Sequence, residues 1–261
     1  MTEAEIDARF AVAQTLVREA GALALRYFAD IGALTIVSKG LQDMASQADT
    51  ETEILIRDRL QQHFPQDAFF GEETGAAGLH GAAGIWVVDP IDGTQPFVSG
   101  LSTWCVSIAF VADGVTEIGC VFAPVSDEMF VARRGRDATL NGRPIRPHAG
   151  QSFRDGIVSV GYSPRVGPAQ ILPVLQRLLE GGGMFHRNGS GTLSLCYVGC
   201  GRLLGYVEPH INSWDCLAAL LVITEAGGRT NDFLTGDALL RGNRVVAGPP
   251  AVFGALQALF G

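Results

Sequence analysis

Two aspartates, Asp89 and Asp92, stand three residues apart at the end of a short apolar segment. The four residues before Asp89, 85–88, are β-branched or aromatic, which is typical of a buried strand. Pro90 cannot donate to a strand ladder, so we expect the strand to end at Asp89 and the carboxylates to lie in a tight turn completed by Gly93. Acids released at a strand end, beside a helix start, could hold hard cations against a phosphate group. Taken alone, the stretch favours an ordinary turn.

Two further acidic sites change this interpretation. Glu72 and Glu73 follow the apolar, strand-like pair Phe69-Phe70 and one glycine, and Asp215 opens a strongly apolar helix. We expect both sites to converge with the first pair of aspartates on one pocket. Carboxylates crowded together repel one another and take up protons, whereas bound divalent cations remove that conflict. The acidic residues together therefore indicate a site for divalent metal ions.

The combined motifs resemble the inositol monophosphatase family of magnesium-dependent, lithium-sensitive phosphomonoesterases. The resemblance runs from the first predicted helix to the last. It rests on Gly71-Glu72-Glu73, Asp89-Pro90-Ile91-Asp92-Gly93-Thr94, and Trp214-Asp215 followed by Thr224-Glu225-Ala226-Gly227-Gly228. Many members carry Asn before the Phe that follows Asp-Gly-Thr, whereas Pro96 precedes Phe97 here. We expect this departure to affect the mouth of the substrate site and not the metal chemistry.

The resemblance implies a site for two to three Mg²⁺ ions. Glu72, Asp89 and the backbone carbonyl of Ile91 would bind the first ion. Asp89, Asp92 and Asp215 would bind the second, so that Asp89 bridges the two. Hard oxygen ligands are those that Mg²⁺ prefers. Two such ions about 3.5–4 Å apart stabilise both the attacking and the leaving oxygens of an in-line displacement.

The resemblance also assigns the residues that act on the attacking water. Glu72 and Thr94 would orient this water, and Asp49 would support the Thr94 hydroxyl. Asp49 also has an interpretation as an N-terminal helix cap, because it stands just before Thr50–Glu53, which resembles a capping box. Lys39, at a predicted hairpin tip, corresponds to a hairpin near the third metal position.

Contacts to the substrate are implied from two directions. Backbone N–H groups at Gly93 and Thr94, where we expect a helix to begin, can donate to phosphate oxygens. By resemblance, Gly191-Thr192 faces the substrate, and Glu208, seven residues before Asp215, contacts its hydroxyl groups. The residues assigned to the substrate are therefore Asp92, Gly93, Thr94, Gly191, Thr192, Glu208 and Asp215.

We therefore expect a Mg²⁺-dependent phosphomonoesterase that uses in-line attack by water, with inositol monophosphate as the leading substrate. Histidinol phosphate is the alternative, because Phe97–Leu101 followed by Trp104 is similar to that branch of the family. A nucleotide 3′-phosphate is a third candidate. A regulatory binding protein, from a different class, also stays open, since some family members act through partner macromolecules.

Composition limits the other function classes. The chain of 261 residues is 47% hydrophobic and 18% charged, and its net charge of −8 argues against a nucleic-acid-binding surface. Five cysteines without a Cys-x-x-Cys pair predict reduced core residues of a cytoplasmic protein. We expect neither a signal peptide nor a membrane span. The family implies a homodimer, which agrees with a mean hydropathy of +0.22.

Hydrophobic periodicity predicts the elements that position these residues. Apolar residues at helical spacing predict a long helix between Ile6 and Tyr27, a second helix begins near Thr50, and an antiparallel meander follows over 104–132. Beyond it, predicted strands and helices alternate. The strands are 157–160, 184–186, 202–208 and 244–246, and the helices are 168–179, 192–200, 215–226 and 251–260.

An antiparallel half followed by an alternating half fits two sheets with helix layers between and outside them. The resemblance implies the fold class α/β (α+β), a five-layered αβαβα sandwich with an antiparallel N-terminal sheet and a mixed C-terminal sheet. We expect an N-terminal α+β subdomain, residues 1–147, with most metal ligands. A C-terminal α/β subdomain, residues 148–261, would carry Asp215 and substrate contacts.

Overall fold

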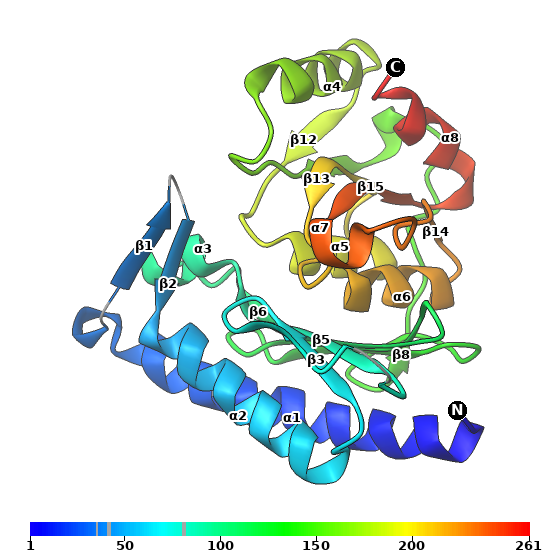
Figure 1. The fold of residues 1–261 in the computed structure, drawn as a ribbon. Coiled ribbons are helices and arrows are strands. Elements are labelled where there is room, and N and C mark those ends of the chain that lie inside the picture. The colour runs from blue at the N-terminus through cyan, green and yellow to red at the C-terminus, as the bar shows by residue number, and fades with distance from the viewer. Residues whose placement is uncertain (35, 41–42, 80–81) are drawn as a thin grey trace.

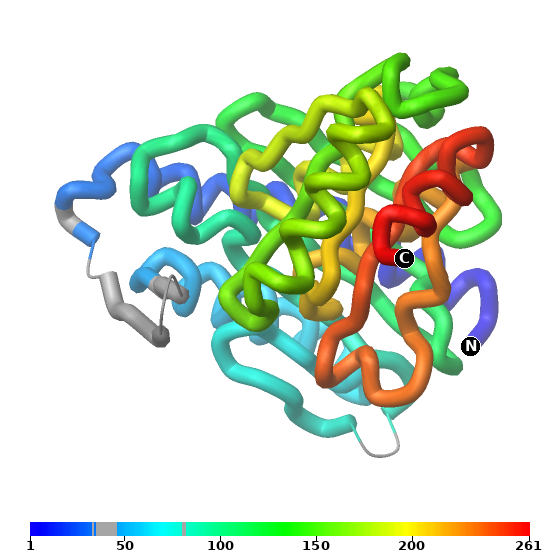
Figure 2. The backbone as a smooth tube through the Cα atoms, turned by 90° about the horizontal axis from the view of Figure 1, so that it is seen from above, coloured from blue at the N-terminus to red at the C-terminus, as the bar shows by residue number. Residues whose placement is uncertain are grey.

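The computed structural model describes residues 1–34, 36–40, 43–79 and 82–261. They form five layers in the order helix, sheet, helix, sheet, helix, so the predicted αβαβα sandwich is confirmed (Figure 1). Seen from above, the first residues of the chain (blue) and the last helix (red) lie toward the same end of the molecule (Figure 2).

Six longer helices form the three helical layers. The outer layer below the larger sheet consists of α1 (Glu3–Ala29) and α2 (Gln47–His63). The central layer consists of α5 (Gly191–Gly199) and α6 (Leu217–Glu225), and the far layer of α4 (Pro168–Glu180) and α8 (Pro250–Ala258). In α6, every residue from Leu217 to Ile223 is buried, because a helix between two sheets must be apolar on all sides.

The larger sheet has eight strands in the order β10-β9-β8-β7-β6-β5-β3-β4. They are β3 (Ala68–Gly71), β4 (Gly75–Ala77), β5 (Ile85–Asp92), β6 (Cys105–Ala112), β7 (Val115–Ala123), β8 (Glu128–Arg133), β9 (Thr139–Leu140) and β10 (Arg143–Pro144). The predicted meander is confirmed as β6, β7 and β8. Its first turn uses positive φ angles at Asp113 and Gly114, which match the right-handed twist of the hairpin.

One pair of strands departs from the predicted antiparallel pattern of this sheet. β3 runs parallel to β5, with Gly71 opposite Val88, so the larger sheet is mixed. The parallel direction follows because the chain crosses back through β4 before it enters β5. As a consequence, the residues that follow both strands meet at the same edge of the sheet.

The smaller sheet has five strands in the order β12-β11-β13-β15-β14, and it is mixed as predicted. They are β11 (Ile157–Val160), β12 (Met184–His186), β13 (Gly205–Ile211), β14 (Arg229–Thr230) and β15 (Asn243–Gly248). Two parallel pairs, β11–β12 and β11–β13, direct the carboxyl ends of these strands toward the same side of the sheet.

The remaining elements are short. They are the helices α3 (Thr94–Val98) and α7 (Ala238–Arg241), the 3₁₀ turns η1 (Ile31–Ala33) and η2 (Phe153–Asp155), and the hairpin strands β1 (Ile36–Gly40) and β2 (Asp43–Ser46). β1 continues through Lys39, so the predicted hairpin tip at that residue is wrong. The Lys39 side chain lies outside the described residues, and its assignment to a third metal stays a prediction.

The core crosses the expected subdomain boundary. One cluster of buried apolar residues joins Val121 and Phe130 of the larger sheet to Leu217 of α6 and Val245 of β15. α6 packs very closely on β7, where Gly119 has no side chain. A Cβ atom at Gly119 would come within 2.3 Å of the Ala218 carbonyl oxygen. The two halves therefore share one apolar interior.

The five cysteines are free, and four of them are buried, which confirms their predicted place in the core. In the described part of the chain, no helix is both long and apolar enough to cross a membrane.

Candidate functional site

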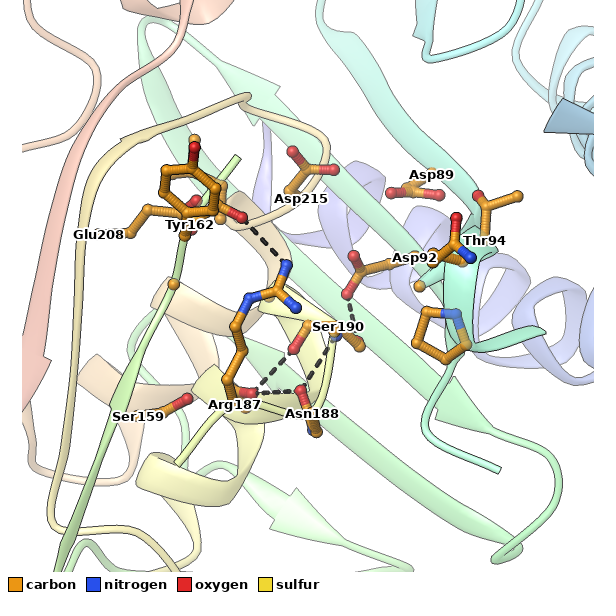
Figure 3. A pocket seen from close by; sticks show the side chains of 18 of the residues that line it. Asp89, Asp92, Thr94, Ser159, Tyr162, Arg187, Asn188, Ser190, Glu208 and Asp215 are labelled. Atoms are coloured by element: carbon orange, nitrogen blue, oxygen red, sulfur yellow. Dashed lines mark hydrogen bonds between the residues drawn. The ribbon is translucent and has the colours of Figure 1, made fainter. Parts of the chain in front are cut away.

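A cavity of about 700 Å³ opens between the ends of the two sheets (Figure 3). Its walls come from five places along the chain, which are the turn after β3, the end of β5 with α3, the loops after β11 and β12, and β13 with the segment before α6. Five of the acidic residues singled out from the sequence lie on these walls. They are Glu72, Asp89, Asp92, Glu208 and Asp215.

An irregularity in β5 brings Asp89 and Asp92 into the same cavity. The predicted strand end at Asp89 is wrong, because β5 continues to Asp92 through a bulge opposite β6. In a regular strand, residues three apart point to opposite faces, and one extra residue reverses the second side chain. Pro90 is tolerated because it lies in the bulge, where the ladder needs no N–H donor.

Glu72, Asp89 and Asp215 form the densest acidic cluster. One oxygen of each carboxylate lies within 4.8 Å of the others. Glu72 reaches Asp89 through the parallel pairing of β3 with β5, in which the Glu72 N–H donates to Val88 O at 3.2 Å. Asp215 is oriented by the Asn212 N–H, which donates to its Oδ2 at 3.3 Å.

The surroundings of this cluster disfavour negative charge. Burial raises the pKa of Asp89 well above its usual range, and the neighbouring carboxylates, first that of Glu72, raise it further. Burial also raises the pKa of Asp215. Hard oxygen donors, crowded together and short of positive charge, are suited to bind a divalent cation such as Mg²⁺.

Asp92 is held from the start of α5. Its Oδ2 accepts from the Thr192 N–H at 2.7 Å and from the Ser190 hydroxyl at 2.5 Å. Burial, followed by the Asp215 charge, still raises the pKa of Asp92 to about 7. The Thr192 hydroxyl donates to Asp215 O at 2.7 Å. Through these two hydrogen bonds Thr192, which is fully buried, connects the Asp92 and Asp215 segments, and its neighbour Gly191 lines the cavity. The predicted contact of Gly191 and Thr192 with substrate stays a prediction.

Asp49 has both roles that the sequence analysis considered, which are helix capping and support of the Thr94 hydroxyl. α2 begins three residues earlier than predicted, with Ser46 as N-cap, so Asp49 lies inside the first turn. Its Oδ2 accepts from the Ser46 N–H at 2.8 Å and completes a capping box. Its Oδ1 lies 3.1 Å from the Thr94 hydroxyl, which lies at the same distance from Ile91 O. Asp49 therefore supports both the helix and Thr94.

Gly93 and Pro96 shape the turn beside this pair. Gly93, with φ of 98°, is the N-cap of α3, and Thr94 is the first helical residue, so a helix begins where it was expected. Pro96 lies in the first turn of α3, where a helix needs no N–H donor from it. Its ring packs on Gly189, where a Cβ would come within 2.6 Å of Pro96 Cγ. The residue at this departure therefore lies against a glycine in the wall of the cavity.

Glu208 occupies the opposite wall, on β13. It is 4% exposed, and the Tyr206 hydroxyl donates to its Oε2 at 2.5 Å. Burial raises the pKa of Glu208 to about 8. Space for this pair depends on Gly161, because a Cβ there would lie 2.3 Å from both the Tyr206 hydroxyl oxygen and Glu208 Oε2.

Comparisons with known proteins give the family. The model of the inositol monophosphatase family matches residues 5–259. The chain belongs to that family. It is 34% identical over 244 residues to Nus factor SuhB of Haemophilus influenzae, covering 92% of this chain and 91% of that protein. It is 34% identical over 260 residues to inositol-1-monophosphatase of Rhizobium meliloti, covering 96% of each.

A solved structure shows the same fold for the family. The extragenic suppressor protein suhB of Bartonella henselae superposes with a TM-score of 0.90 at 30% sequence identity, over 97% of this chain and 98% of that one. The inositol monophosphatase fold of this chain is thereby established.

Sequence reasoning missed the basic wall of the cavity in this family member. Arg165 Nη2 lies 3.7 Å from Asp215 Oδ2. Arg187 Nη2 donates to Tyr162 O at 3.1 Å (Figure 3). Both arginines lie in loops that follow parallel strands of the smaller sheet. Their position directly after predicted strands could have indicated that they line the cavity, because ligands of open α/β sheets bind outside the carboxyl ends of strands.

The acid cluster predicts how stability depends on pH without metal. From about pH 4 to about pH 7, native Asp92 keeps a proton that the unfolded chain releases, so the native state binds more protons and its stability falls as pH rises. One such proton contributes a slope of about 1.4 kcal/mol per pH unit. The free energy of unfolding, measured with urea in the presence of a chelator, should therefore fall less steeply with pH in Asp92→Asn than in the wild type. The difference in slope should be up to that amount.

Saturating Mg²⁺ should reduce the wild-type slope, because a cation replaces the protons. Parallel stability curves for wild type and Asp92→Asn in chelator would refute the assigned pKa shift.

Proposed function

We propose that this protein is a Mg²⁺-dependent phosphomonoesterase that hydrolyses a small phosphate monoester, with inositol monophosphate as the leading substrate. One observation carries the proposal. Three carboxylates, those of Glu72, Asp89 and Asp215, place oxygens within 4.8 Å of one another beside the Thr94–Asp49 pair. A cation site next to a polar group that can hold water is what phosphate ester hydrolysis requires.

The proposed ligands divide between two ions. Glu72, Asp89 and the Ile91 carbonyl would hold one ion, and Asp89, Asp92 and Asp215 would hold the other. When bound, Mg²⁺ supplies positive charge that acidifies water and offsets the charge of phosphate oxygens.

Thr94 and Glu72 would prepare the nucleophile. The Thr94 hydroxyl has one proton and points it toward Asp49 or Ile91 O, so its oxygen is left to accept a hydrogen bond from water. Glu72 would take the second hydrogen bond and then the proton of that water. Orientation by two acceptors aims the water lone pair at the phosphorus atom.

The phosphate and the alcohol portion would lie on different walls. Gly93, Thr94 and Gly191 line the cavity where helices begin, and their backbone N–H groups would face the phosphate. Glu208 would contact the alcohol portion from β13. Its protonated carboxyl group can both donate to and accept from ring hydroxyls, which favours a polyol. Its ionised form would suit the amine of histidinol phosphate.

A regulatory role is the second candidate function. It is favoured by the name Nus factor SuhB that the Haemophilus influenzae relative carries. Regulation does not require the acidic cluster, so the two candidates are separated by phosphate release from the purified chain.

We also propose a homodimer. Exposed apolar side chains gather on α4 and the neighbouring strand β12, which is an edge of the smaller sheet. They are Leu172, Leu179, Met184 and Phe185. Exposed apolar residues beside an open strand edge suit a surface that a second copy of the chain covers.

The phosphatase proposal predicts metal-dependent release of phosphate. The purified chain should release phosphate from inositol monophosphate only with Mg²⁺, and Asp92→Asn should lower kcat by roughly a hundredfold or more while the fold persists. Histidinol phosphate and a nucleotide 3′-phosphate complete the panel, and Li⁺ should inhibit more than Na⁺ at equal ionic strength. Asp113→Asn, at an exposed turn, is the matched control.

Two results would contradict this proposal. Full turnover by Asp92→Asn would refute the ligand assignment. Phosphate release from none of the substrates, despite Mg²⁺ binding, would leave the regulatory candidate in its place.

Substrate selection predicts an effect of Glu208→Gln that depends on the alcohol. The amide would accept from Tyr206 and turn its NH₂ group to the cavity, so it could donate to the substrate but no longer accept. We expect kcat/KM to fall roughly ten- to a hundredfold for the true substrate, most for histidinol phosphate, and to stay nearly constant for an aryl phosphate. Equal losses on all three would place Glu208 in the metal site or the fold.

The homodimer proposal predicts that charge on β12 separates the protomers. Phe185→Glu should give the monomer mass of 27.6 kDa by light scattering, because a carboxylate cannot be buried unpaired in an apolar interface. Leu240→Glu changes an exposed leucine on α7 instead and serves as control. A wild-type protein that is already monomeric at micromolar concentration would contradict the proposal.

A further inference from the structure

Glu53 is a buried acid of α2 that the proposed chemistry does not use. It stands four residues after Asp49, so both carboxylates lie on one face of the helix. The side chain is 0% exposed, and burial of an acid is costly unless its oxygens accept hydrogen bonds. Where those hydrogen bonds come from therefore indicates what Glu53 does.

Both oxygens of Glu53 accept from the turn that carries Glu72. Oε2 accepts from the Glu73 N–H at 2.8 Å, and Oε1 accepts from the Thr74 N–H at 2.8 Å. Hydrogen bonds from backbone N–H groups to a carboxylate are among the stronger ones in proteins. Glu53 thus fixes the two amides that directly follow Glu72.

The same carboxyl group also lies directly against Gly71, the residue before Glu72. A Cβ atom at Gly71 would come within 2.4 Å of Glu53 Cδ, so only glycine leaves room for it. On the other side, the Glu72 N–H donates to Val88 O of β5. The Glu72 backbone is therefore held between a strand ladder and a buried carboxylate.

We propose that Glu53 is a positioning residue that sets where Glu72 stands relative to the metal site and the attacking water. The inference rests on the proposed function. On this proposal α2 supports both residues that orient the water, Thr94 and Glu72. Asp49 accepts from the Thr94 hydroxyl, and one helical turn later Glu53 accepts from the amides that follow Glu72.

The test measures the Kd for Mg²⁺ binding to the full chain by titration calorimetry. In Glu53→Gln, an NH₂ group must face one of the two backbone N–H donors, so one hydrogen bond is lost and the turn shifts. We expect the Kd for Mg²⁺ to rise roughly ten- to a hundredfold, as for other residues that orient metal ligands. Glu51→Gln, an exposed change on the same helix, should leave Kd unchanged.

A double-mutant cycle separates positioning from general destabilisation. In the Glu72→Gln background, Glu53→Gln should change the Kd by no more than about twofold, because the ligand it positions is already altered. The same fold loss in both backgrounds would overturn the inference, as would an unchanged Kd in the single variant. If Glu53→Gln does not fold, Gly71→Ala displaces the same carboxyl group and should raise the Kd similarly.

Activity distinguishes this inference from the proposed function. At saturating Mg²⁺, Glu53→Gln should lower kcat equally on inositol monophosphate and an aryl phosphate, since Glu72 acts on water and not on the alcohol. A wild-type chain that binds Mg²⁺ without hydrolysing phosphate esters would refute the phosphatase alone, and the Kd comparison would still decide the role of Glu53. A wild-type chain that binds no Mg²⁺ overturns both.

Discussion

Mutual repulsion among buried carboxylates is the constraint on which the rest of this structure depends. Asp89 and Asp92 are buried, Asp215 is partly buried beside them, and the pKa of each is raised as a result. Such an arrangement costs several kcal/mol per ion unless positive charge or hydrogen bonds offset it. The surrounding elements provide the hydrogen bonds, whereas the remaining charge is what gives the cluster its affinity for a cation.

The hydrogen bonds that hold the acids come from rigid places in the fold. The start of α5 donates to Asp92, and the bulge in β5 places the Ile91 N–H against Asp89. Each is an element end or an irregularity, where backbone groups are not used by the regular pattern. The fold therefore concentrates its unpaired backbone groups where the chemistry needs them.

The sequence predicted the layers and the acidic residues of the cavity, because both are marked by local patterns. Apolar periodicity locates helices and strands, and the spacing of Asp89, Asp92 and Asp215 is specific to one family. The parallel pairing of β3 with β5 could not be predicted, since it arises from a contact between distant segments. Arg165 and Arg187 were missed although both follow predicted strands of the smaller sheet. The strand end at Asp89 was wrong because a bulge overrides the rule that proline stops a ladder.

The contact between Gly119 and Ala218 has a consequence for cation choice. α6 lies with its backbone directly against β7, so close packing restrains movement of the helix that follows Asp215 relative to the sheet that carries Asp89. Under the proposed function, such restraint would make it costly to widen the metal site for a larger ion. Ca²⁺, which takes more ligands at 2.3–2.6 Å than the roughly 2.0–2.1 Å octahedron of Mg²⁺, would meet these walls as strain. The absence of a side chain at Gly119, in the middle of a sheet, would in this way favour the smaller ion.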